Sequence, residues 1–255
     1  AEAIAKGLGG QLPKDEALLA EVTNLVERPT AILGTFDERY LQSLPPEVLI
    51  GVMKKHQRYF PVLNSEGNLM NHFVVVRNGD DRFKEIVADG NLQVVHARFA
   101  DAEFFVKQDE EKQINDFLPD LAKLTFQKQL GSMLDKTQRI SALVGSLGKR
   151  LGLDEAEQKT ANRVAELAKA DLASSMVVEM TELQGVMGKY YALNSGEEEA
   201  VAQGIYEHYL PRSAGDSLPG SAAGFVVGLA DRMDSLTGLF TAGLAPTGNK
   251  DPFAL

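Results

Sequence analysis

Two groups of residues in this sequence have the types and spacing that chemistry requires. The first is the basic run 54–59, KKHQRY, in which four potential cations accompany an aromatic ring. Lysine and arginine bind phosphates and a tyrosine ring stacks on a base, so this run predicts a nucleic-acid contact. The structural alternative is that the cations sit at the end of a helix, where they favour its dipole.

The second group consists of aspartates on apolar helical segments, Asp171, Asp231 and Asp234. Carboxylates combined with imidazoles bind a divalent ion that activates water, as in HD-type phosphohydrolases, which use a His, a His-Asp pair and a distant Asp. Here the pair reads Ala170-Asp171, and the only histidine after residue 125 is His208. We therefore interpret Ala170, Asp171 and Asp231 as degenerate HD-type positions, and we expect no bound metal.

Composition limits the class of protein. The chain has 255 residues with 44% hydrophobic and 24% charged side chains, which suits one large or two ordinary globular domains. It has no cysteine, which excludes disulfides and zinc–cysteine sites. The formal net charge is -10, so any nucleic-acid surface must be a local patch. No apolar run is long enough to span a membrane and no secretory signal is visible, so a cytoplasmic location is expected.

The elements that must position the basic run mix helices with strands. We expect a helix from Pro13 to about Glu27, a buried strand over 30–34, and a helix capped by Ser43 that ends in the basic run. Apolar segments on either side of the loop 64–68 predict a β-hairpin. Its second strand contains Phe73-Val74-Val75-Val76, a continuous apolar run that is typical of a central strand.

Gly90 and the spacing of apolar residues determine the secondary structure that we expect in the rest of the chain. Gly90 is expected to interrupt the chain before a helix over 91–106. After Gln113 no strand is expected, because the apolar residues follow helical spacing. Residues 161–193 read as a helix with Asp171 at its middle, then a turn, then a second helix that opens at Glu182. The predicted fold class is an α+β domain followed by an all-α domain.

Seven longer segments resemble a known family. They are 46–50 (PEVLI), 53–62 (MKKHQRYFPV), 97–105 (ARFADAEFF), 169–172 (KADL), 182–192 (ELQGVMGKYYA), 207–212 (EHYLPR) and 248–255 (GNKDPFAL). In this order they resemble the β subunit of the bacterial two-subunit (heterotetrameric) glycyl-tRNA synthetase. The chain looks like an internal piece of that subunit.

This resemblance implies an organisation and a function. Residues 1–120 resemble the editing-type domain of the phenylalanyl-tRNA synthetase β subunit, and residues 121–255 resemble an all-α HD-like domain. In the family the α subunit activates glycine with ATP, and the β subunit binds and positions tRNA. The resemblance therefore implies a fragment with no active site or cofactor of its own. Its implied partners are glycine tRNA and the α subunit, with no role at DNA or at a membrane.

The expected RNA contacts follow from the matched segments, with the acceptor arm of tRNA as the expected target. The expected tRNA-binding residues are Lys54, Lys55, His56, Arg58, Tyr59 and Arg98 in the first domain, and Lys189, Tyr190, His208 and Arg212 in the second. Each has a structural alternative as a solvated or core residue. Two other functions stay open, a residual HD-type phosphohydrolase and a scaffold that docks the α subunit.

Overall fold

The computed structural model describes residues 1–246 and 251, so the segment 248–255 lies outside the described residues except for Asp251. The chain forms two compact units, the first unit Ala1–Lys107 and the second unit Gln108–Leu255. This division lies before the expected boundary after residue 120. The reason is that the 3-10 helix η2 (Ile114–Lys123) packs on helices of the second unit.

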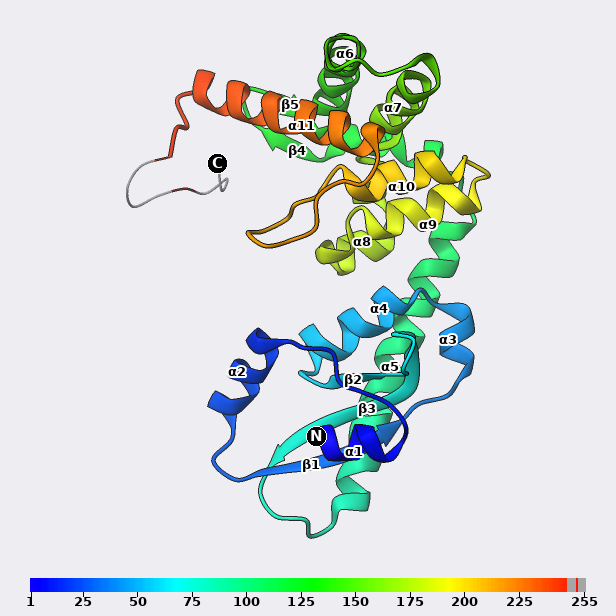
Figure 1. Cartoon of the computed structure of the whole chain (residues 1–255), viewed down its shortest axis with the longest axis vertical. Coiled ribbons are helices and arrows are strands. Elements are labelled where there is room, and N and C mark those ends of the chain that lie inside the picture. The colour runs from blue at the N-terminus through cyan, green and yellow to red at the C-terminus, as the bar shows by residue number, and fades with distance from the viewer. Residues whose placement is uncertain (247–250, 252–255) are drawn as a thin grey trace. The chain divides into compact units, whose positions relative to one another are not determined.

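The first unit combines helices with a small sheet (Figure 1). Its elements are α1 (Glu2–Gly7), α2 (Glu16–Leu25), β1 (Pro29–Thr35), α3 (Arg39–Ser43), α4 (Pro46–Gly51), the π-helical turn η1 (Val52–His56), β2 (Phe60–Leu63), β3 (Leu69–Asn78) and α5 (Lys84–Glu110). Asp15 caps α2 by accepting a hydrogen bond from the Leu18 N–H at 2.9 Å. Ser43 is the last residue of α3 and Pro45 precedes α4, so the predicted Ser43 cap is wrong.

The sheet has the strand order β1-β3-β2 and is antiparallel throughout. The pairing of β1 with β3 runs from Pro29 opposite Asn78 to Thr35 opposite His72. The predicted hairpin around residues 64–68 and the predicted central strand are both confirmed. The central strand β3 is paired with a strand on each side, which is where a continuous apolar run is most favourable.

Side chains on the two faces of β3 pack in two different clusters, because successive residues of a strand point to opposite faces. Val74 packs in a cluster that includes Leu18 and Val22 of α2. Phe73 points the other way and stacks on Tyr59, with ring centroids 5.0 Å apart. An aromatic cluster of Phe36, Tyr40 and Phe99 also forms in this unit, with centroid distances of 5.1 and 5.2 Å to Phe99.

Helix α5 corrects one sequence prediction. It runs from Lys84 to Glu110 without interruption, so Gly90 does not break it. A glycine inside a helix costs about 1 kcal/mol relative to alanine, and a helix of this length can absorb that cost. Near its end Asp109 accepts hydrogen bonds from the Ser175 and Met176 N–H groups (2.8 and 2.9 Å) and the Tyr191 hydroxyl (2.7 Å). The last turn of α5 is therefore part of the second unit.

The second unit is mainly helical. Besides η2 its elements are β4 (Thr125–Gln127), β5 (Gly131–Ser132), α6 (Met133–Leu151), α7 (Glu155–Leu167), η3 (Ala170–Ala173), α8 (Ser175–Glu179), η4 (Thr181–Leu183), α9 (Val186–Asn194), α10 (Glu199–Glu207) and α11 (Ala222–Thr241). The short strands β4 and β5 pair with each other, so the expectation of no strand after Gln113 is wrong in this detail. No described helix is long and apolar enough to cross a membrane.

Helices α6, α7, α10 and α11 pack together around buried side chains such as Ile140, Val164, Ile205 and Val227. Ser132 and Asp154 begin α6 and α7 with capping boxes, in which the cap side chain and an acid three residues later bond each other's backbone N–H.

Two glycines in the first unit should respond to alanine in opposite ways. A Cβ at Gly34 would lie 2.1 Å from the Phe73 ring, whereas a Cβ at Gly90 would meet nothing within 4 Å. We expect Gly34→Ala to lower the free energy of unfolding by about 1–3 kcal/mol through overpacking. Gly90→Ala should raise it by up to about 1 kcal/mol. Urea unfolding followed by circular dichroism measures both, and equal effects of the two substitutions would contradict the packing described for β1.

Candidate functional site

The basic run 54–59 lies at the end of η1 and in the residues that follow it. The Lys54 ammonium forms an ion pair with Asp15, and the Arg58 Nε lies 2.6 Å from the Glu21 Oε1. Asp15 caps α2 and Glu21 lies on it, so this helix partly neutralises the run. Two of the expected phosphate contacts are thus already engaged within the protein.

Tyr59 is part of the core and is only 5% exposed. Its ring stacks on Phe73 and its hydroxyl donates a hydrogen bond to the Asn91 Oδ1 at 2.7 Å. Burial raises the pKa of this hydroxyl. The prediction that Tyr59 stacks on a nucleic-acid base is therefore corrected, because the ring presents almost no surface to solvent.

The other expected contacts of the first unit lie on its surface. Lys55 and His56 are exposed at the end of η1, and Arg98 is exposed on α5. Each of these side chains is accessible to a phosphate. Their contacts with RNA stay predictions.

The expected contacts of the second unit also differ in how exposed they are. Arg212 is exposed, although one of its guanidinium nitrogens donates to the Gln184 carbonyl at 3.1 Å. Lys189 and Tyr190 on α9 are half-buried, and the Lys189 ammonium donates to the Gln203 Oε1 at 2.9 Å. These residues stay predictions as well.

His208 is completely buried, with an exposed fraction of 0%. Its Nδ1 lies 2.5 Å from the Ile205 carbonyl oxygen. Burial lowers the pKa of this imidazole well below its usual value, and the Lys169 ammonium lowers it further. A neutral, enclosed ring cannot reach a phosphate, so the prediction of a tRNA contact at His208 is corrected.

The most densely charged part of the interior surrounds Asp231 of α11. Its carboxylate binds two lysine ammonium groups, Lys136 of α6 at 2.8 Å and Lys169, which precedes η3, at 2.7 Å. Both lysine side chains are only 4% exposed. Lys136 also lies 3.1 Å from Asp234, which in turn binds the Arg139 guanidinium at 2.6 Å.

In this cluster, burial disfavours the charged forms of the side chains and ion pairing favours them. Burial alone would raise the pKa of Asp231, but the Lys169 and Lys136 ammonium groups outweigh it and hold that pKa well below its usual value. Burial lowers the pKa of Lys169, while the Asp231 carboxylate opposes that change. The cluster therefore joins α6, the segment after α7 and α11 through ionised groups.

Asp171 occupies a different environment from Asp231. Helix α7 ends at Leu167 and Asp171 lies in η3, so the prediction of Asp171 at the middle of a helix is wrong. Its Oδ2 accepts hydrogen bonds from the Gly185 and Gly188 N–H groups at 2.6 and 3.1 Å, while its Oδ1 has no hydrogen-bond partner among the residues that the structure describes. These bonds hold η3, which contains Asp171, against the start of α9.

The start of α9 explains a second difference. The helix begins at Val186 after Gly185, whose φ of +79° suits a glycine, and not at Glu182 as expected. The hydrogen bond to Asp171 fixes this conformation. Among residues 1–246 and 251, no group of three or more His, Asp and Glu is arranged to hold a metal.

Sequence reasoning missed Lys136 and Lys169 as functional neighbours of the aspartates. Lysine on a helix is usually solvated, and nothing in the sequence pairs Lys136 with a residue 95 positions away. Lys169 carried a weak signal, because it directly precedes Ala170-Asp171 within an apolar stretch.

Removing the central carboxylate should destabilise the second unit. Asp231→Asn leaves the buried Lys169 ammonium without its counter-ion and leaves Lys136 with Asp234 alone. Breaking a buried ion pair costs about 3–5 kcal/mol in comparable proteins. We expect a loss of this size in the free energy of unfolding, measured by urea titration. Asp120→Asn removes a more exposed carboxylate paired with Lys123 and serves as the control, with little change expected. Similar small losses in both variants would contradict the role of the cluster.

Asp171 should give the second unit a characteristic pH dependence. Burial raises its pKa from 3.8 to about 6, despite the hydrogen bonds from Gly185 and Gly188 that lower it. The folded state thus favours the protonated acid, and this contribution to stability is complete below pH 3.8 and is lost as the pH rises through about 6.

The matched comparison is Asp171→Asn, which cannot ionise. Between about pH 4 and about pH 7 the wild type should lose up to about 3 kcal/mol of unfolding free energy relative to this variant. Urea titrations across this range measure the difference. If the unfolding free energies of the two proteins changed with pH in parallel, Asp171 would not be the group that causes the pH dependence.

Comparison with known proteins places these features in a family. The sequence matches the family described as "Glycyl-tRNA synthetase beta subunit" over residues 1–255. It is 50% identical over 252 residues to the glycine–tRNA ligase beta subunit of Desulforamulus reducens, covering 99% of this chain and 36% of that protein. The corresponding subunit of Synechocystis sp. is 50% identical over 251 residues, covering 98% of this chain and 35% of that protein.

The beta subunit of Bacillus subtilis is 45% identical over 254 residues, covering 100% of this chain and 37% of that protein. The chain thus spans about a third of the length of the curated relatives that it matches. The resemblance of the seven segments is confirmed across the whole sequence. The chain belongs to the glycyl-tRNA synthetase beta subunit family.

Proposed function

We propose that this chain is a tRNA-binding, non-catalytic part of a glycyl-tRNA synthetase β subunit. It binds and positions glycine tRNA through the acceptor arm, so that the α subunit attaches glycine with the use of ATP. The observation that carries the proposal is the match to the family over the whole chain. We further propose that the first unit corresponds to the editing-type domain and the second unit to the HD-like domain.

Side chains on both units support the RNA-binding part of the proposal. Lys55, His56 and Arg98 are exposed on the first unit and Arg212 on the second. The proposal that this chain is non-catalytic is supported by the interactions of the two aspartates at degenerate HD-type positions. Asp231 is neutralised by two ammonium groups and Asp171 accepts backbone hydrogen bonds. This arrangement disfavours the alternative of a residual HD-type phosphohydrolase.

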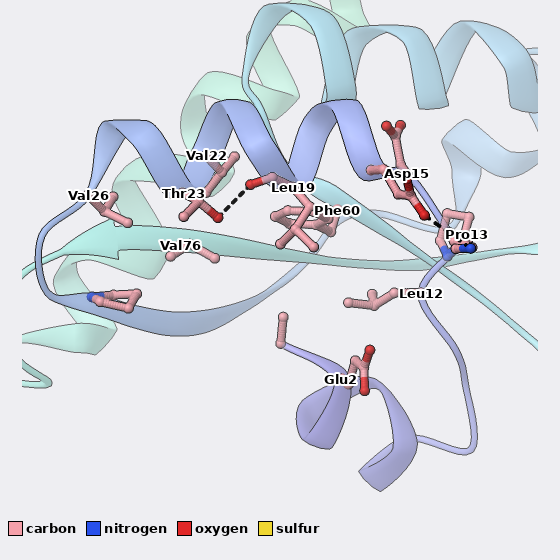
Figure 2. Close-up of a pocket in the computed structure, with 14 residues that line it drawn as sticks. Glu2, Leu12, Pro13, Asp15, Leu19, Val22, Thr23, Val26, Phe60 and Val76 are labelled. Carbon is pink, nitrogen blue, oxygen red and sulfur yellow. Dashed lines mark hydrogen bonds and ion pairs between the residues drawn. The ribbon is translucent and has the colours of Figure 1, made fainter.

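A second candidate function is a scaffold that docks the α subunit. It is favoured by an apolar groove of about 580 Å³ in the first unit, between α1, α2 and the sheet (Figure 2). Leu12, Leu19, Val26, Phe60 and Val76 are among the residues that line it. An exposed apolar groove of this kind suits a protein partner better than it suits a phosphate backbone.

One titration separates the two candidate functions. The chain is added to labelled glycine tRNA, to a non-cognate tRNA and to an acceptor-arm minihelix, each at two salt concentrations. Tight binding of the minihelix that weakens steeply with salt supports positioning of the acceptor arm. Absence of binding to all three RNAs would overturn the RNA-binding proposal and leave the scaffold function.

A charge reversal in the basic run should weaken RNA binding. Lys55→Glu places a carboxylate where a phosphate is expected, so we predict an affinity loss of about tenfold and a smaller salt dependence. Lys149→Glu, on the last turn of α6, makes the same change of net charge away from the proposed contacts and is the control. Equal affinity of the wild type and Lys55→Glu in the titration would remove Lys55 from the interface.

A further inference from the structure

The turn between β3 and α5 and the first turn of α5 each expose a large apolar side chain. Phe83 is 72% exposed and Ile86 is 71% exposed. Phe83 also has a φ of +57°, a left-handed conformation that aromatic residues rarely adopt. Neither the exposed ring nor its backbone conformation gains stability from packing. Such a combination points to a function at the surface.

The turn that carries Phe83 is held firmly to β1. The Gly79 N–H donates to the Arg28 carbonyl at 2.8 Å, and the Thr30 hydroxyl donates to the Gly79 carbonyl at 2.5 Å. The Arg77 guanidinium donates to the Arg82 carbonyl at 3.0 Å, next to Phe83. The ring is therefore presented from a turn that is already fixed, which reduces the entropy lost on binding.

Two arginines gather at Asp80, in the same turn as Phe83. Asp80, whose side chain is 21% exposed, lies 2.8 Å from the Arg82 Nε and 4.0 Å from the Arg28 guanidinium. The side chains of Arg28 and Arg82 are 73% and 78% exposed. Arg28 together with residues 77–86 carries four basic and three acidic side chains, and the adjacent Glu27, which accepts a hydrogen bond from the Asn78 amide, balances the fourth cation. We call these residues the Phe83 corner.

We propose that the Phe83 corner binds an unpaired nucleotide of RNA, with the base stacked on the Phe83 ring and adjacent phosphates on Arg28 and Arg82. Stacking on an aromatic ring combined with guanidinium–phosphate contacts is the chemistry by which single-stranded nucleic acid is held. The two exposed guanidinium groups favour a partner that carries phosphates. The inference rests on the proposed function and adds to it the structural element of the RNA that is recognised.

The absence of tryptophan from the sequence makes a direct test possible. Phe83→Trp introduces a single indole at the corner, and Phe104→Trp introduces one at a 63% exposed position of α5 as the matched control. Each variant is titrated with a glycine tRNA transcript and with a blunt RNA duplex that has no unpaired nucleotide. Anisotropy of labelled RNA measures total binding in the same samples.

Stacking predicts that the tRNA quenches the indole fluorescence of the Phe83→Trp variant, with little quenching by the duplex and little response of the Phe104→Trp variant. Phe83→Ala should weaken tRNA binding about tenfold, since one stacked base has this order of effect. Binding of the tRNA with no selective quenching at position 83 would overturn the inference while the proposed function stands. Failure of the wild-type chain to bind the tRNA at all would overturn the proposed function itself.

Discussion

The second unit depends on the pairing of one carboxylate with two ammonium groups in an interior that excludes water. Asp231 holds Lys136 and Lys169 at 2.8 and 2.7 Å, and these three residues come from α6, α11 and the segment before η3. Buried charges are costly unless they are paired, so the helices must approach each other at the distances that the pairing sets. The pairing thus ties α6, α11 and the segment before η3 together at defined distances.

The pattern of apolar residues was sufficient to predict much of the fold. The hairpin around residues 64–68 and its central strand follow from spacing and turn residues, which act over short distances. Some of the errors concern features that depend on distant parts of the chain. Asp171 lies outside α7 because the N–H groups of Gly185 and Gly188 bind its carboxylate.

The candidate site was less predictable for the same reason. The sequence groups Tyr59 with its basic neighbours, whereas the fold turns its ring inward onto Phe73 and leaves Lys55 and His56 outside. Similarly, His208 adjoins Tyr209 and Arg212 in one segment, yet it is buried while Arg212 is exposed. Adjacent residues can point in opposite directions, so a motif in sequence predicts a surface only after the orientation of each side chain is known.

The burial of Lys136 and Lys169 also has a chemical consequence. Amine-reactive reagents modify a lysine only when its ammonium group can lose a proton in contact with solvent, and both side chains are 4% exposed and held by carboxylates. Their modification requires the helices of the second unit to separate. The rate at which these two amines are labelled therefore reports the local opening of the second unit, independently of the many surface lysines that react in the folded state.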